Sequence, residues 1–456
     1  MATALSVTQG GGAGTGERHA RVHAAHAGLV RRFDPLAADG LTATVLVELS
    51  DVGPTTIEIG QGHCTIRDLV RTRGPELTFT TSSAVWLDLV EGHIRGMDAF
   101  LGGDLTVSGD LHLATRFETL FRRLPHQPRV EVTHTRVRGL QLETLVAGEG
   151  AGPPVLLIHG LGANKVSFLP TVSALADHAE VHAIDLPGFG RSDKPLPTGR
   201  RYTMAWFADM VNGYLIARGL DAAHMVGNSM GGRIALEVAL RHPRSVHSFV
   251  GLGPALGFDL TRHLTPLLRL APAQWSGLAP LRLPRRAVER FVRDLFADAD
   301  VLPPEHHRVA ADDVQRAWED PRHRLAVLAA ARQLGVERAH GPAAYWRRLR
   351  SLTVPSLWVF GEQDRLVASR YAARVAAAVP DATVETWPGV GHVPQFEAAS
   401  RTAATLTAWL EARRDDPGAR LLVPAGAPRQ ATSAVASRQA TSAVASRSSQ
   451  PSTASR

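Results

Sequence analysis

Ser229 lies in the stretch Val226–Leu240, where Gly227-Asn228-Ser229-Met230-Gly231 separates an apolar segment from a helical one. A serine in such a G-x-S-x-G turn sits on a strained backbone with its hydroxyl exposed, and the chain crosses itself so closely that both flanking positions must be small. An incidental serine in a glycine-rich turn is the alternative. We predict that Ser229 is a nucleophile and that the amide of Met230, at the start of the following helix, binds an oxyanion.

A serine nucleophile needs a base, and the base needs an orienting acid. The chain has 20 histidines, so position along the chain must select one. His392 in WPGVGHVPQFE follows the last strand-like segment, and Asp364 in VFGEQDRLV follows the strand before it. The order Ser229, Asp364, His392 is that of one class of serine hydrolases. Glu362 and Asp259 stay open as rival acids.

The second oxyanion donor should come from the loop after the first central strand, which reads LLIHGLGANK. In this loop His159-Gly160 precedes Leu161, and we assign the second amide to Leu161. The alternative is a tight turn at His159-Gly160 that has no catalytic use.

The elements that must position these residues are short apolar strands alternating with helices from about residue 130 to residue 413. The strand-like segments are VLLIH, EVHAID, HMVGNS, VHSFVGLG, SLWVFG and TVETWP. This alternation indicates a parallel sheet covered on both faces, with its site at the carboxyl ends of the strands. A helical insert follows Gly253, and its segment RRAVERFVRDLF carries an apolar stripe. We interpret the stripe as lid packing; a membrane-binding face is the alternative.

The stretches LLIHGLG, DLPGFGRSDKP, VGNSMGG, FGEQDRLV and GVGHVPQFE occur in this order and resemble the α/β-hydrolase superfamily. The resemblance implies a core sheet of eight mostly parallel strands over residues 130–413, with a helical lid at about 255–345. It places nucleophile, acid and base on Ser229, Asp364 and His392. The serine argues against haloalkane dehalogenases and epoxide hydrolases, which use an aspartate there. GNSMGG followed by GLGPALG also resembles carbon–carbon bond hydrolases, although Leu161-Gly162-Ala163-Asn164 departs from their usual Gly-Pro-Gly extension.

An earlier block, residues 17–125, combines a helix-like start, strand-like alternation in ATVLVELS and TTIEIG, and a helix from Ser82 to about Gly92. Its closing stretch Gly96–Phe121 resembles the sterol carrier protein, type two, lipid-binding family. The resemblance implies an α+β domain with an apolar tunnel; a purely structural or dimerising domain is the alternative. Aromatic and aliphatic residues supply a core: Phe79, Trp86, Leu89, Phe100, Leu105, Val107, Leu113, Phe117 and Phe121.

The two ends of the chain differ from these blocks in composition. Residues 1–16 contain GGGAGTG and are predicted to be flexible, and residues 414–456 form an Ala/Ser/Arg-rich tail with a nine-residue repeat, predicted to be disordered. The five arginines that follow Asp416 account for +5 of the net charge of +7. The rest of the chain is nearly neutral, which argues against a nucleic-acid groove.

One cysteine excludes an internal disulfide, and no run of eighteen apolar residues exists. Together with an N-terminus that lacks a signal-like apolar core, this favours a cytoplasmic protein without an integral membrane segment, although transient contact with a membrane surface stays open. The predicted function is cleavage of an apolar, lipid-like carboxylic ester through an acyl-enzyme, with no metal or organic cofactor. The alternatives are carbon–carbon bond hydrolysis of a diketone-like acid and a non-catalytic lipid-binding or scaffolding role. The fusion suggests that the first block presents an apolar substrate to the second.

Overall fold

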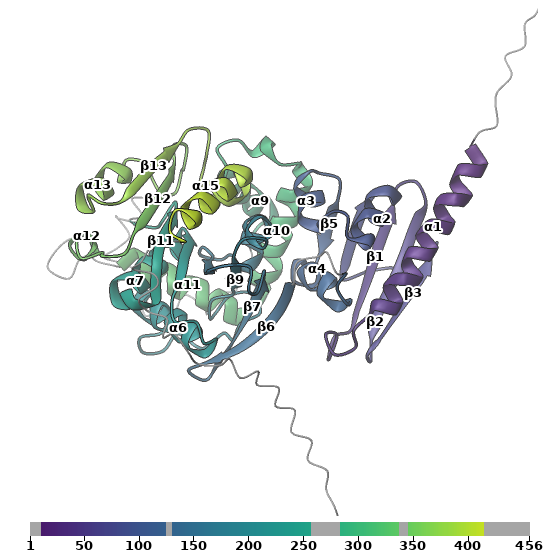
Figure 1. The fold of residues 1–456 in the computed structure, drawn as a ribbon, viewed down its shortest axis with the longest axis horizontal. Coiled ribbons are helices and arrows are strands. Elements are labelled where there is room, and N and C mark those ends of the chain that lie inside the picture. The colour runs from purple at the N-terminus through teal and green to yellow at the C-terminus, as the bar shows by residue number, and fades with distance from the viewer. Residues whose placement is uncertain (1–10, 125–129, 257–282, 337–344, 415–456) are drawn as a thin grey trace, which may run out of the picture.

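The computed structural model describes residues 11–124, 130–256, 283–336 and 345–414. Two sheets organise these residues, a five-stranded one in the N-terminal domain (residues 11–124) and an eight-stranded one in the main domain (residues 130–414). The two domains lie side by side along the long axis of the molecule (Figure 1). Rival acid Asp259, residues 125–129 at the junction of the two predicted blocks, and the tail from residue 415 lie outside the described residues.

The N-terminal domain is an α+β unit whose sheet has the order β3-β2-β1-β4-β5. Its strands are β1 (Ala43–Leu49), β2 (Gly53–Gly60), β3 (His63–Asp68), β4 (Leu77–Thr81) and β5 (Thr106–Gly109). Its helices are α1 (Gly11–Arg32), α2 (Ser83–Glu91), α3 (Gly96–Leu101) and α4 (Leu111–Phe117). α2 begins and ends where predicted, because Ser82 caps its first turn and Gly92 adopts a left-handed conformation (φ 77°) at its end.

Two details of this domain differ from expectation. α1 begins at Gly11, six residues before the expected boundary at residue 17. The glycines of this segment disfavour a helix, but α1 is anchored further along by buried Val22 and Leu29, and a helix propagates readily from an existing turn. β3 was not predicted, because its side chains alternate only between exposed and half-buried positions.

The main domain contains the eight expected strands, in the order β13-β12-β11-β10-β8-β9-β7-β6. β6 and β7 are antiparallel to their neighbours, and the remaining strands are parallel. Their bounds are β6 (Val130–Val137), β7 (Leu140–Ala147), β8 (Pro154–Ile158), β9 (Glu180–Ile184), β10 (Ala223–Asn228), β11 (Val246–Leu252), β12 (Ser356–Gly361) and β13 (Thr383–Trp387). The α/β-hydrolase core expected from sequence is therefore confirmed.

Helices cover both faces of this sheet, as the runs of buried apolar residues in its central strands require. One face packs against α6 (Met204–Ala217), α7 (Met230–Arg241), α12 (Tyr345–Leu349) and α13 (Tyr371–Ala378). The other packs against α5 (Leu169–Leu175) and α15 (Ala399–Glu411). None of the helices that the structure describes combines the length and apolarity needed to span a bilayer.

A helical insert follows β11, the sixth strand of the main domain, and its described part holds α9 (Arg285–Asp294), α10 (Pro304–Glu319) and α11 (Pro321–Val336). Val288 and Val292 of the predicted apolar stripe pack on Ala311 of α10, whereas Phe291 of the same stripe is 50% exposed. α10 also lies against β5 of the N-terminal domain, and α3 lies against α5. The lid thus contacts both domains.

Candidate active site

Ser229 lies at the sharp turn between β10 and α7. Its φ of 54° is a backbone conformation that residues other than glycine rarely adopt. A Cβ atom on Gly227 would collide with the backbone of Gly231, and one on Gly231 would overlap the carbonyl oxygen of Ile158. The glycines are therefore required for the chain crossing. Met230 is the first residue of α7, and amides in a first helical turn have no intrahelical acceptor.

Asp364 and His392 form a buried pair at the ends of neighbouring strands β12 and β13. The Nδ1 atom of His392 lies 2.8 Å from Oδ2 of Asp364, whose other oxygen accepts the amides of Leu366 and Val367 at 2.8 Å each. Rival acid Glu362 is exposed to solvent. The pair is tightly packed, because a Cβ on Gly253 would lie 3.2 Å from Oδ2 of Asp364 and 3.5 Å from Nδ1 of His392.

Two residues that sequence reasoning missed hold the His392 loop in place. The side-chain amide of Asn228, directly before the serine, donates to the carbonyl oxygens of Leu252 and His392 at 2.9 Å each. The buried carboxylate of Glu397 accepts the amide of Gly391 at 2.6 Å, and its second oxygen accepts the lid amide of Ala297 at 2.6 Å. Asn228 directly precedes Ser229, and Glu397 lies in the same motif as His392. Their closeness in sequence to the candidate nucleophile and base was the signal that could have identified them.

The loop after β8 brings Gly160 and Leu161 to the serine. A Cβ on Gly160 would lie 3.4 Å from the Cβ of Ser229. The ring of His159 is fully buried, with Nδ1 2.8 Å from the carbonyl oxygen of Gly160 and Nε2 accepting the amide of Leu186 at 3.1 Å. Burial lowers the pKa of His159. Both ring nitrogens are engaged with backbone, so this histidine fixes the loop and is unavailable for proton transfer.

A cavity of about 1470 Å³ contains Leu161, Ser229 and His392 in its wall. Every residue of the predicted lid stripe also lines it: Ala287, Val288, Phe291, Val292, Leu295 and Phe296. The cavity continues into the N-terminal domain, where Phe79, Trp86 and Phe117 line it. The candidate nucleophile and base therefore open onto a space whose walls come from three parts of the chain.

Gln395 is a polar exception in this wall. It lies on the short helix α14 (Pro394–Glu397), lines the cavity and is 1% exposed. Among the described residues, neither its side-chain oxygen nor its side-chain nitrogen has a hydrogen-bond partner. Buried amides are normally paired, so the unpaired side chain of Gln395 is an exception among the polar groups of the cavity wall.

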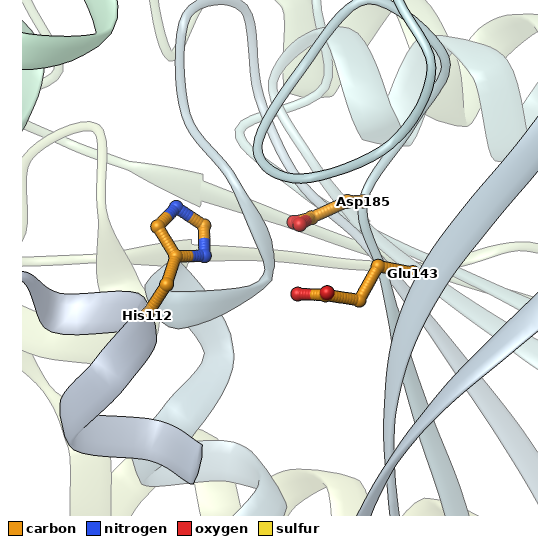
Figure 2. A group of neighbouring side chains, drawn as sticks. All are labelled: His112, Glu143 and Asp185. Atoms are coloured by element: carbon orange, nitrogen blue, oxygen red, sulfur yellow. The ribbon is translucent and has the colours of Figure 1, made fainter. Parts of the chain in front are cut away.

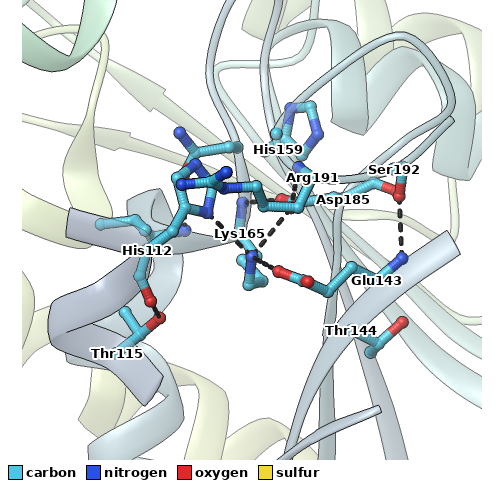
Figure 3. Close-up of polar contacts among 12 residues, drawn as sticks. His112, Thr115, Glu143, Thr144, His159, Lys165, Asp185, Arg191 and Ser192 are labelled. Carbon is cyan, nitrogen blue, oxygen red and sulfur yellow. Dashed lines mark hydrogen bonds and ion pairs between the residues drawn. The ribbon is translucent and has the colours of Figure 1, made fainter. Parts of the chain in front are cut away.

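A second cluster of titratable groups lies at the boundary between the domains. The ligand atoms of His112, Glu143 and Asp185 lie within 4.8 Å of one another (Figure 2). The ammonium group of Lys165 lies between them, 3.0 Å from Nδ1 of His112, 2.6 Å from Oε1 of Glu143 and 2.8 Å from Oδ2 of Asp185 (Figure 3). The lysine occupies the position that a metal ion would take, so we interpret the cluster as a buried salt bridge.

The charges of this cluster follow from its partners. Burial opposes the charged form of Lys165, but Asp185 and Glu143 outweigh it and raise the lysine pKa. Burial likewise opposes ionisation of Asp185, yet Lys165 holds the pKa of that carboxyl well below its usual range. Burial and the neighbouring Lys165 lower the pKa of His112, which therefore accepts a hydrogen bond as a neutral ring.

Comparison with known proteins agrees with this architecture. Residues 153–399 match the alpha/beta hydrolase fold family, and residues 34–122 match the SCP-2 sterol transfer family. The pimeloyl-[acyl-carrier protein] methyl ester esterase of Aeromonas hydrophila is 30% identical over 54% of this chain and 90% of its own length. The 2-hydroxymuconate semialdehyde hydrolase of Pseudomonas sp. strain CF600 is 28% identical over 58% of this chain and 88% of its own length.

Among solved structures, that of a bacterial membrane phospholipase A, described as a virulence factor, shares the fold with a TM-score of 0.53 and 23% identity, covering 73% of this chain and 97% of the other. The 2-hydroxy-6-oxo-6-phenylhexa-2,4-dienoate hydrolase of Rhodococcus sp. strain RHA1 shares it with a TM-score of 0.51 and 23% identity, over 62% of this chain and all of the other. The chain therefore belongs to the alpha/beta hydrolase family, as an enzyme whose catalytic fold is preceded by a domain of the SCP-2 sterol transfer family.

Proposed function

We propose that the protein is a serine hydrolase that cleaves apolar carboxylic esters through an acyl-enzyme. The observation that carries this proposal is the pairing of His392 with Asp364 at 2.8 Å beside a serine held at φ 54° in the same cavity. In such an arrangement the acid fixes the histidine tautomer that leaves Nε2 free to accept a proton.

In the proposed reaction Ser229 Oγ attacks the ester carbonyl while His392 takes its proton. The amides of Leu161 and Met230 stabilise the oxyanion, and His392 returns the proton to the leaving alcohol. His392 then takes a proton from water, which attacks the acyl-enzyme, and returns that proton to Ser229 Oγ as the acyl–oxygen bond breaks and the acid leaves. The positions of Asn228 and Glu397 support this assignment, because both hold the histidine loop against the serine turn.

The preference for an apolar ester is supported by the cavity wall and by one relative. Aromatic and aliphatic side chains from the lid and the N-terminal domain dominate the lining. The Aeromonas hydrophila relative is a methyl ester esterase. We assign no metal or organic cofactor to this mechanism, because each step uses a group of the chain or water.

Replacement of the serine tests the proposal. Ser229→Ala should lower kcat for a 4-nitrophenyl ester by about 10⁶-fold and abolish labelling by a fluorophosphonate, because the nucleophile of a triad is lost. Ser351→Ala, an exposed serine, is the matched control and should change neither readout. Wild-type protein that resists the fluorophosphonate would favour the remaining alternative, a lipid-binding or scaffolding protein.

Carbon–carbon bond hydrolysis of a diketone-like acid is the second candidate. It is favoured by the similarity to 2-hydroxymuconate semialdehyde hydrolase. Comparing kcat/KM for a vinylogous diketone acid with that for a 4-nitrophenyl ester separates the two functions. Our proposal requires the ester to be the better substrate.

A further inference from the structure

We propose that the cavity is one binding site shared by both domains, in which a single long-chain ester places its ester group at Ser229 and its apolar chain inside the N-terminal domain. This inference rests on the proposed function, since it assigns the substrate class of the same serine. It also gives the N-terminal domain a specific task, namely to hold the far end of the substrate during hydrolysis.

The first support is the continuity and size of the cavity. It is lined at one end by Ser229 and His392 and at the other by Phe79, Trp86 and Phe117, which belong to the hydrophobic core of the N-terminal domain. Its volume of about 1470 Å³ exceeds the roughly 300–1,000 Å³ of ordinary small-molecule pockets. The space suits a ligand longer than a simple ester.

The second support is the construction of the passage where the domains meet. Phe100 of α3 lines the cavity, and its ring packs edge-on against His306 of α10, with ring centres 4.0 Å apart. The Nε2 atom of His306 lies 3.0 Å from the carbonyl oxygen of Phe100. Arg95 adds a hydrogen bond of 2.7 Å to the carbonyl oxygen of Ser173 on α5. These contacts join the N-terminal domain to the main domain beside the cavity. They fix the part of the cavity in one domain relative to the part in the other.

The third support is that the far end presents a preorganised apolar wall. The indole nitrogen of Trp86 donates to Nε2 of His26 at 2.8 Å, and Nδ1 of His26 lies 2.5 Å from Oδ1 of Asp68. The polar edge of the tryptophan is thus satisfied away from any ligand. Arg32 and Arg116 also line this part, and each donates to a backbone carbonyl, of Val90 and Ala37 respectively. Glu118 and Thr119 also line this part, but most of its wall is apolar, including Leu89, Leu105 and Val107, which favours an alkyl or acyl chain.

A bifunctional probe tests the path of the chain directly. An alkyl fluorophosphonate reacts when Ser229 Oγ forms a bond to phosphorus, the phosphorus–fluorine bond breaks, and fluoride leaves with the serine proton. A hexadecyl version with a diazirine at its distal carbon is then irradiated, losing dinitrogen to give a carbene that inserts into its neighbours, and the cross-linked peptides of the full-length protein are mapped by mass spectrometry.

We expect cross-links from the hexadecyl probe within residues 77–121, and cross-links from a hexyl homologue only within the main domain. Labelled Ser229 with hexadecyl cross-links confined to the lid or to other parts of the main domain would overturn the shared site while leaving the serine hydrolase intact. Absence of serine labelling would overturn the proposed function itself, so the two failures are distinguishable.

A blocking variant provides the kinetic test. Ala114 lines the cavity on α4, so Ala114→Trp should fill the N-terminal part. Each methylene kept out of an apolar site costs about fourfold in affinity. The variant should lower kcat/KM for a hexadecanoate ester by tenfold or more and leave the butanoate ester within twofold, which also shows that the protein is folded. The control, Ala24→Trp on the exposed side of α1, should change neither value. Equal losses for both esters, or none, would contradict the shared site.

Discussion

Two buried histidine–carboxylate groups in this molecule look alike in composition and differ in access. His392, paired with Asp364, faces the cavity that contains Ser229. His112, with Asp185 and Glu143, instead surrounds Lys165, whose side chain is fully buried. A histidine whose acceptor nitrogen is taken by a lysine has no capacity left to move a substrate proton. The comparison teaches that residue types alone identify candidate catalytic groups. A histidine can act as a base only if one ring nitrogen has a free lone pair that faces a cavity.

Between the two histidine–carboxylate groups, the largest expected effect concerns the acid of the first, Asp364. Asp364→Asn should lower kcat by about 10⁴-fold, because an amide favours the wrong tautomer of His392. Steady-state ester hydrolysis measures the loss. Glu362→Gln alters the exposed rival two residues upstream and should stay within twofold of wild type. A result in which Glu362→Gln is the damaging variant would reverse the assignment of the acid.

A substitution in the second group, which surrounds Lys165, should lower the stability of the protein and change the rate of ester hydrolysis little. Lys165→Met leaves two buried carboxylates without their cation and should lower the free energy of unfolding by about 3–5 kcal/mol, measured by urea denaturation. Turnover per folded molecule should change by less than tenfold. Lys194→Met is the control, because this lysine is partly exposed and lies 3.8 Å from Asp320, and it should cost about 1 kcal/mol or less. A collapse of kcat with unchanged stability would place Lys165 in the chemistry.

Gln395 sharpens the contrast, since the Lys165 ammonium has three partners and this amide has none among the described residues. Gln395→Leu should raise the free energy of unfolding by about 1–3 kcal/mol, because an unpaired buried amide is removed. KM for the ester should increase if the amide meets the substrate. Thermal denaturation and a KM-against-kcat comparison measure the two effects. Gln141→Leu, at an exposed position, should stay within about 0.5 kcal/mol of wild type, and a loss of stability in Gln395→Leu would show that the amide is satisfied.

The smallest effect is a pH dependence at the domain boundary. The groups facing His112 are Lys165, Asp185, Glu143, Asp313 and Arg191, and burial and Lys165 lower the His112 pKa. The unfolded chain therefore binds this proton at a higher pH than the folded protein does. Stability from this group is present above about pH 6.5 and is lost as the pH falls towards the lowered value, by up to about 1.4 kcal/mol per pH unit.

His112→Gln should flatten that part of the profile, measured as the free energy of unfolding between pH 7 and pH 5. His63→Gln, at an exposed position on β3, is the control and should keep the wild-type slope. An identical slope in wild type and His112→Gln would remove His112 as its source.

The sequence allowed the catalytic fold to be predicted because its signals are local. The glycines around Ser229, and the loops that carry Asp364 and His392, can each be recognised from a few consecutive residues. Strands β8 to β12 were readable for the same reason, as each is a short and largely buried apolar run, whereas β13 lies at the edge with only Trp387 buried. By contrast, β3 has no consistently buried face, so no pattern marked it.

The boundary cluster could not be predicted in this way. His112 lies 53 residues before Lys165 and belongs to the other domain, so only the packed structure brings them together. Nor did any pattern indicate that Glu397 would bind both the histidine loop and the lid, because its carboxylate contacts a lid amide 100 residues away. Long-range pairings of charged groups depend on how elements dock, and single-sequence patterns do not encode docking.

Because Lys165 takes one of its three partners from α4, the two halves of this chain are not interchangeable modules. A chimera joining the main domain to a different carrier would inherit an ammonium ion with one acceptor missing, unless the new carrier placed a lone pair at the same point. Recombination between such proteins is therefore constrained by the single ring nitrogen of His112 that accepts from Lys165.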